Sequence, residues 1–89
     1  MIEERITLIN KLGLHIRASN VLVNTCQRFN SKIELIRSDK TADAKSIMNL
    51  MLLGAPCGTE LTLRVEGDDE QAAFGAVKAL IHNRFGESE

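Results

Sequence analysis

Apolar and polar residues alternate in several short segments of the chain, and this alternation predicts β-strands. The clearest strand is Leu61–Val65, and Arg5–Ile9 and Ile33–Leu35 show the same pattern. A further short strand is predicted at Thr41–Ala44, paired with its predecessor as a hairpin. The segment Asn10–Gly13 ends the first strand. Alternation leaves one face of each strand exposed to water, so we expect an antiparallel sheet covered on one face only.

Three other segments place apolar residues three or four positions apart, which predicts helices. They are Ile16–Phe29, Ile47–Leu53 and a long segment from Asp69 or Glu70 to Phe85. Ser46 is a favoured N-cap and Gly54 a favoured C-terminal stop for the short helix, and Gly86 stops the long one. The predicted order is β-α-β-β-α-β-α, an α+β fold, and we expect residues 87–89 to be frayed.

A chain of 89 residues, 44% of them hydrophobic, predicts one small domain over residues 1–89. The net charge of −1 and the 3% of aromatic residues argue against binding to nucleic acid. No apolar run approaches the length of a membrane span and no signal pattern opens the chain, so we expect a cytoplasmic protein without membrane insertion. Cys26 and Cys57 lack metal-ligand spacing, and we expect neither a metal site nor a disulfide.

The segment Gly13–Arg17 is the strongest candidate for chemistry. It places His15 at the start of a predicted helix, where unpaired N–H groups and the helix dipole favour a phosphate group. The planar guanidinium of Arg17 can bind a phosphoryl group by two parallel hydrogen bonds. The segment alone leaves open that His15 is an ordinary loop histidine. His82 lies one position past an apolar stripe, and we assign it no role.

This segment resembles the active-site motif of the HPr family, the histidine-containing phosphocarrier proteins of the phosphoenolpyruvate-dependent phosphotransferase system. Other segments resemble the regulatory serine segment of that family, its last strand-to-helix turn and its ending. These segments are Ala44–Met48, Glu66–Ala72 and Arg84–Glu87. The resemblance extends from about Ile6 to Glu87, with matching spacing throughout.

The resemblance implies an HPr-like open-faced two-layer sandwich, with an antiparallel four-stranded sheet of order 1-4-2-3 and three helices on one face. It implies that His15 accepts a phosphoryl group on Nδ1 from phosphorylated enzyme I. Sugar-specific EIIA-type acceptors or regulatory targets would then receive the group. Arg17 and the backbone N–H groups of Ile16 and Arg17 would stabilise the phosphate. The resemblance implies a monomer without a cofactor, and a transfer component rather than a complete enzyme.

Two further roles come with the resemblance. In the family, the serine matching Ser46 is modified by an ATP-dependent kinase, the HPr kinase/phosphorylase, and this modification lowers phosphotransfer; a plain N-cap is the alternative. We expect Ile16, Ile47, Met48 and Met51 to form a partner-docking patch. The alternative is that the short helix is sunk into the core.

The sequence departs from the family pattern at four positions near these motifs. Ala18 and Ser19 replace the usual Pro-Ala pair, so the start of the helix loses the rigidity of proline. Ile16 replaces a usually small residue, and Asn49 stands where glycine is frequent. These departures affect the expected partners more than the fold. A nitrogen-linked carrier agrees with them as well as a sugar-uptake carrier does.

Two other functions remain open on the sequence. A regulatory HPr-like binding module would dock on enzymes or transcription factors without carrying phosphotransfer flux. The missing proline after Arg17 supports it, whereas the retained His15 and Arg17 count against it. An unrelated α/β ligand-binding domain rests only on the order of elements.

Overall fold

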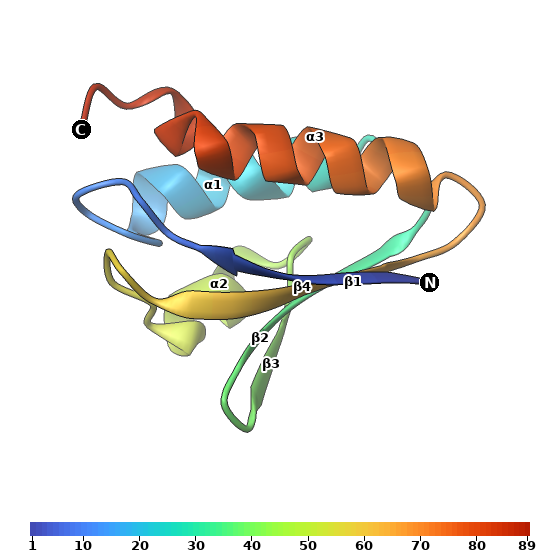
Figure 1. Ribbon diagram of the computed structural model, residues 1–89, viewed down its shortest axis with the longest axis horizontal. Coiled ribbons are helices and arrows are strands. Elements are labelled where there is room, and N and C mark those ends of the chain that lie inside the picture. Colours follow the sequence, from blue (N-terminus) through green and yellow to red (C-terminus); the bar gives the residue numbers. More distant parts are fainter.

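A computed structural model describes residues 1–89 and shows a four-stranded antiparallel sheet with three helices on one face (Figure 1). The elements are β1 (Ile2–Thr7), α1 (Ile16–Cys26), β2 (Lys32–Arg37), β3 (Lys40–Asp43), α2 (Ile47–Leu53), β4 (Glu60–Glu66), α3 (Glu70–His82) and a short 3-10 turn at Arg84–Gly86. The strand order is β1-β4-β2-β3. The predicted fold class and strand order are therefore confirmed.

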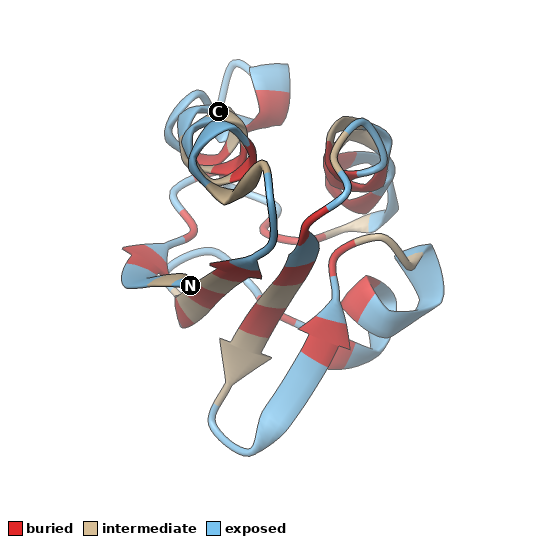
Figure 2. Cartoon of the chain, turned by 90° about the vertical axis from the view of Figure 1, so that its right-hand side faces the viewer, coloured by how far each residue is buried: buried red, intermediate tan, exposed pale blue.

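The sheet owes its two unlike faces to the alternation along its strands. β4 pairs antiparallel with β1 on one side and with β2 on the other. Its residues Leu61, Leu63 and Val65 are buried, and Thr62 and Arg64 between them are partly exposed. Burial of one such aliphatic side chain contributes about 1.5–3 kcal/mol. Figure 2 shows the same alternation as buried bands across the strands.

The helices α1 and α3 lie side by side over the sheet, and α2 lies near β3 (Figure 1). The buried residues of α1 are Ala18, Ser19, Leu22, Val23 and Cys26. Val21, which the sequence places on the apolar stripe, is only partly buried, because α1 is turned so that Val23 faces the core. The helix ends at Cys26, so the predicted extension to Phe29 is wrong.

Other boundaries also differ from the predictions. β2 is longer at both ends than the predicted Ile33–Leu35, and β3 runs from Lys40 to Asp43 rather than from Thr41 to Ala44. β1 runs from Ile2 to Thr7 rather than from Arg5 to Ile9, because its whole length pairs with β4. α3 ends at His82, three residues before the predicted end at Phe85. Arg84 and Phe85 have positive φ angles of 53° and 55°, so the chain turns sharply there. Phe85 still reaches the core, but from this turn and not from a helix.

Candidate functional site

His15 stands at the N-cap of α1, between the loop after β1 and the first helical turn. Its backbone is extended, with φ −73° and ψ 177°, and its side chain makes no cap hydrogen bond. The amide groups of Ile16 and Arg17 have no acceptor within the protein. The start of α1 therefore presents free N–H groups and the positive end of the helix dipole beside His15.

The loop that carries His15 is held against the segment after α2. The amide of Leu14 donates to the carbonyl of Ala55 at 2.9 Å. Gly13 has a φ of +61°, and a Cβ at this position would lie 2.4 Å from the Ala55 oxygen. Only glycine combines this left-handed conformation with such a close backbone approach. The close approach of Gly13 and Leu14 to Ala55 therefore positions the start of α1, and His15 with it.

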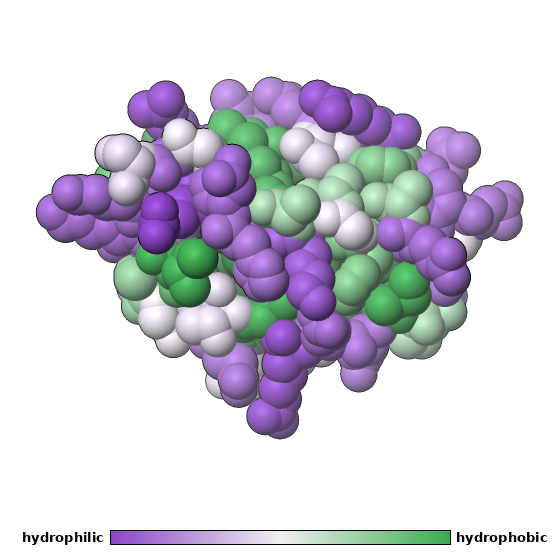
Figure 3. Space-filling model, turned by 45° about the horizontal axis from the view of Figure 1, so that its top comes forward, coloured by the Kyte–Doolittle hydropathy of each residue, from purple (hydrophilic) through white to green (hydrophobic).

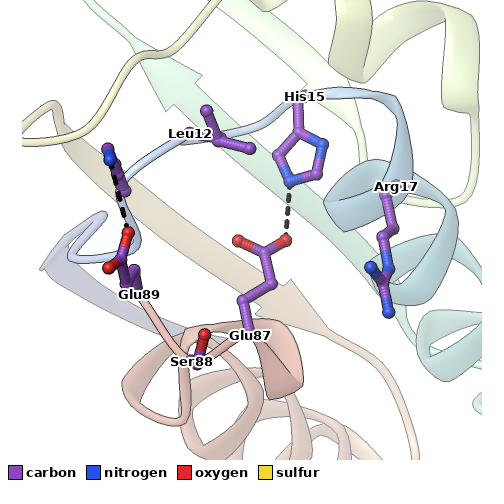
Figure 4. Close-up of a pocket in the computed structure, with 7 residues that line it drawn as sticks. Leu12, His15, Arg17, Glu87, Ser88 and Glu89 are labelled. Carbon is purple, nitrogen blue, oxygen red and sulfur yellow. Dashed lines mark hydrogen bonds and ion pairs between the residues drawn. The ribbon is translucent and has the colours of Figure 1, made fainter.

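The most informative contact of the site joins His15 to Glu87, which the sequence analysis placed in a frayed segment. Nε2 of His15 lies 2.6 Å from Oε2 of Glu87 (Figure 4). Nδ2 of Asn10 donates to the other carboxylate oxygen at 3.1 Å. Glu89 also pairs with Lys11, with 3.3 Å between the charged groups. The expectation of fraying is therefore wrong, because polar contacts hold these residues against the loop after β1.

These residues line a hollow of about 290 Å³. Its lining consists of Lys11, Leu12, His15, Arg17, Glu87, Ser88 and Glu89. Arg17 is exposed and has no ion-pair partner, so its guanidinium is free to meet an anion. Nδ1 of His15 has no hydrogen-bond partner and lies on the side of the ring toward the start of α1 (Figure 4). His15 and Arg17 thus line the same hollow, and the free amides of Ile16 and Arg17 follow His15 directly in the chain.

The contacts of the Glu87 carboxyl lower its pKa from the ordinary value. Burial has the largest single influence and by itself would raise the pKa, but the net direction is downward. Hydrogen bonds from Asn10 and His15, together with the nearby charge of Arg17, outweigh burial. Since the folded-state pKa is depressed, this contact stabilises the fold above the unfolded-state pKa and loses its effect as pH falls through the folded value. At neutral pH the Glu87 carboxylate is ionised and accepts a hydrogen bond from Nε2 of His15.

An ionised carboxylate can only accept a hydrogen bond, so Nε2 of His15 must carry the proton. In the neutral ring the lone pair is then on Nδ1. The geometry therefore makes Nδ1 the nucleophilic nitrogen of His15. His15 and Arg17 are predicted from their place before a helix. Asn10 carries no local motif, and Glu87 lies in a segment that resembles the ending of the family but received no role from the sequence.

Ser46 is the N-cap of α2, as its sequence context predicts. Its Oγ accepts two hydrogen bonds from Asn49, one from the backbone N–H at 3.2 Å and one from the side-chain Nδ2 at 3.1 Å. Gly54 ends the helix in the left-handed conformation, with φ of 62°. Asn49 thus adds a second donor to the cap, which a glycine at this position would not supply.

Apolar side chains of α1 and α2 are exposed at the surface, and Ile16 follows His15 directly in the chain. Met48 is 72% exposed and Ile16 66%, whereas Ile47 and Met51 are closer to 40%. Ile16 and Ile47 line one shallow hollow together with Arg17 and Asn20. The core residues of α2 are Leu50 and Leu53, so the helix is not sunk entirely into the protein. Figure 3 shows apolar groups as separate patches among polar side chains on the helix-covered side.

Several other features carry no chemistry of this site. Cys26 is buried, which raises the pKa of its thiol to about 12, and Cys57 is exposed; both are free thiols. His82 is exposed, as predicted. No three His, Cys, Asp or Glu side chains come together as metal ligands. None of the helices is both long and apolar enough to span a bilayer.

Comparison with known proteins agrees with the geometry of the site. The family model described as "PTS HPr component phosphorylation site" matches residues 2–83. The phosphocarrier protein HPr of Cupriavidus necator is 48% identical over 89 residues, all of both chains.

Solved structures agree. The HPr of Thermoanaerobacter tengcongensis has a TM-score of 0.96 at 42% identity, with full coverage of both chains. Crh, the catabolite repression protein of Bacillus subtilis, has a TM-score of 0.76 at 36% identity, covering 94% of this chain and 97% of that one. With the fold, the matching segments and these likenesses in agreement, the chain belongs to the HPr family of phosphocarrier proteins of the phosphotransferase system.

Proposed function

We propose that this protein carries a phosphoryl group on Nδ1 of His15, received from phosphorylated enzyme I and passed to EIIA-type or regulatory acceptors. The observation that carries the proposal is the pairing of Nε2 with Glu87 at 2.6 Å, which leaves the Nδ1 lone pair free beside the start of α1. Membership of the HPr family supports the partners. The single domain, the monomeric state and the cytoplasmic location stay predictions.

The groups around Nδ1 have complementary parts in this proposal. The phosphoryl group carries negative charge throughout its transfer, so the free amides of Ile16 and Arg17 would bind its oxygens. The Arg17 guanidinium would offset the charge and orient the group by two parallel hydrogen bonds. The hollow beside His15 is open to solvent, which suits a group that must pass between proteins.

Incubation with enzyme I and phosphoenolpyruvate tests the proposal. We expect the intact mass to rise by one phosphoryl group, because only one histidine has a free ring nitrogen beside these donors. The group should be labile in acid and stable in alkali, as expected of phosphohistidine. A protein that gains no phosphoryl group, or gains one that survives acid, would contradict the proposal.

A regulatory binding module is the second candidate. The likeness to Crh over most of both chains favours it, as does Ala18 in the place of the usual proline. Such a module would bind its targets without passing on a phosphoryl group. The same incubation separates the two, because a pure docking module would gain no phosphoryl group from phosphorylated enzyme I.

Ser46 and the apolar patch give a paired prediction about docking. Ser46→Asp should fold normally, since Asp is a good N-cap and its charge suits a helix N-terminus. Its added charge should weaken binding to an acidic surface of enzyme I by severalfold at low salt and less at high salt. Met48→Ala should weaken binding by loss of apolar contact, with little dependence on salt.

The measurement is the dissociation constant for enzyme I at two ionic strengths, with a melting curve for each variant. A marked fall in the melting temperature of Ser46→Asp would mean that Asp cannot replace the serine cap. Wild-type affinity for both variants in either salt would show that enzyme I binds elsewhere. The proposal of Ser46 as a kinase site rests on the family resemblance, and the measured effect of Asp indicates what a phosphate there would do.

A further inference from the structure

Glu87 is held at both carboxylate oxygens. Oε2 faces Nε2 of His15 at 2.6 Å, and Oε1 accepts from Nδ2 of Asn10 at 3.1 Å. The Glu87 side chain is only 14% exposed. A carboxylate fixed by two donors cannot rotate freely, so the His15 ring has a rigid partner on its Nε2 side. The sharp turn at Arg84–Gly86 delivers Glu87 to this place.

Asn10 anchors the Glu87 carboxylate. It is fully buried, and Nδ2 also donates to the Gly13 carbonyl at 2.8 Å. Its Oδ1 is buried without any hydrogen-bond partner. An amide turned the other way would set Oδ1 against the Gly13 carbonyl and the Glu87 carboxylate, both of which repel it. The orientation of the Asn10 amide is therefore set by its two donated hydrogen bonds, at the expense of an unpaired buried Oδ1.

From these contacts we infer that Asn10 and Glu87 are positioning residues that hold the His15 ring in the Nε2–H tautomer and direct Nδ1 toward the phosphoryl donor. The inference deepens the proposed function and rests on it. Asn10 orients the carboxylate, the carboxylate orients the ring, and neither residue touches the transferred group. A carboxylate that fixes a histidine from its far nitrogen is a recurrent way of setting tautomer and orientation.

The transfer step balances with these groups in place. The Nδ1 lone pair forms the new N–P bond, and the bond from phosphorus to the donor atom breaks with its electron pair left on the donor. The ring keeps its proton on Nε2 and becomes positively charged once Nδ1 is bonded to phosphorus. Glu87 lies 2.6 Å from Nε2 and offsets that charge. In the reverse direction the electron pair of the N–P bond returns to Nδ1, and the ring is neutral again.

Glu89 provides a matched control within the same hollow. It also contributes a carboxylate to the lining, but it pairs with exposed Lys11 and does not contact His15. Glu87→Ala and Glu89→Ala each remove one negative charge from this surface. A general electrostatic effect should change both variants alike, whereas positioning of the ring should depend on Glu87 alone.

Nitrogen-15 NMR of His15 and the rate of phosphoryl transfer from enzyme I are measured on wild type and both variants. In wild type we expect a slowly exchanging, downfield Nε2–H proton. Glu87→Ala should lose that signal and transfer roughly ten- to a hundredfold more slowly. Glu89→Ala should keep both the signal and the rate. Melting curves show that each variant is folded at the temperature of the assay.

Two results overturn the inference. One is an unchanged transfer rate in Glu87→Ala, whatever its spectrum. The other is an equal loss in Glu89→Ala. The NMR signal does not depend on phosphotransfer. A wild-type protein could therefore show the Glu87-dependent Nε2–H proton and yet accept no phosphoryl group. That result would contradict the proposed function but not the contact between Glu87 and His15. Asn10→Ala, which removes both donated hydrogen bonds, should reproduce the slow transfer of Glu87→Ala in a protein whose melting curve shows that it is folded.

Discussion

Replacement of His15 by alanine is expected to abolish the acid-labile phosphoryl group completely. His15 combines a free Nδ1 with the unpaired amides at the start of α1. His82 is exposed on the last turn of α3, and no phosphate-binding amides adjoin it. The matched variant His82→Ala should therefore be phosphorylated at the wild-type rate. Intact mass after incubation with enzyme I and phosphoenolpyruvate gives the result directly.

The fold should tolerate this change. His15 is partly exposed, and its substitution removes one contact, that to Glu87. We expect a melting temperature within a few degrees of wild type, because the Glu87 carboxylate keeps its hydrogen bond from Asn10. A phosphoryl group that persists in folded His15→Ala would assign the acceptor to another residue.

The second large effect is expected from Arg17→Ala, which should slow transfer from enzyme I by roughly a hundredfold. The guanidinium is free of ion pairs and lines the hollow beside His15. Its loss removes the charge that offsets the phosphoryl oxygens. Arg17→Lys should recover only part of the rate, because an ammonium restores the charge but not the planar fork. Rapid-quench time courses of phosphoryl transfer from phosphorylated enzyme I give the rates.

Arg28 supplies the control for this prediction. It is exposed beyond the other end of α1, so Arg28→Ala removes the same charge far from His15. We expect Arg28→Ala to transfer at the wild-type rate. Equal rates for wild type and Arg17→Ala would remove Arg17 from the mechanism. Equal losses in Arg17→Ala and Arg28→Ala would point to overall charge as the cause.

The sheet and the short helix could be predicted because their rules are local. Alternation marks β4 to within one residue at each end, since Leu61–Val65 is predicted and Glu60–Glu66 is found. Ser46 and Gly54 mark the ends of α2 through the hydrogen bonds and backbone angles that those residues favour. Strand order was available from the family resemblance and not from the periodicity.

The end of α3 could not be predicted from spacing. Phe85 lies four positions after Ile81, so a helical pattern and the observed turn both place it in the core. The positive φ angles at Arg84 and Phe85 are the deciding feature, and neither residue type favours them. Tertiary packing therefore overrides the local preference at this point.

Half of the candidate site was visible in the sequence and half was not. His15 and Arg17 belong to one short motif before a helix. The contact between His15 and Glu87 joins residues 72 positions apart. A glutamate in the segment Glu-Ser-Glu has the pattern of a solvated charge, and Asn10 has that of a strand end. Only the folded chain shows that these residues meet.

The strand order has a consequence for how the site is acquired and lost. β1 is an edge strand that pairs only with β4, and its partners lie between 53 and 63 positions away in the sequence. We expect pairs of this separation to form late in folding, because closing so long a loop costs chain entropy before any contact is gained. The hairpin of β2 and β3, by contrast, forms between near neighbours. The His15 loop connects β1 to α1, so transient detachment of this edge strand would leave the loop held by its remaining contacts, among them those with Ala55 and Glu87, while the remaining sheet stays folded.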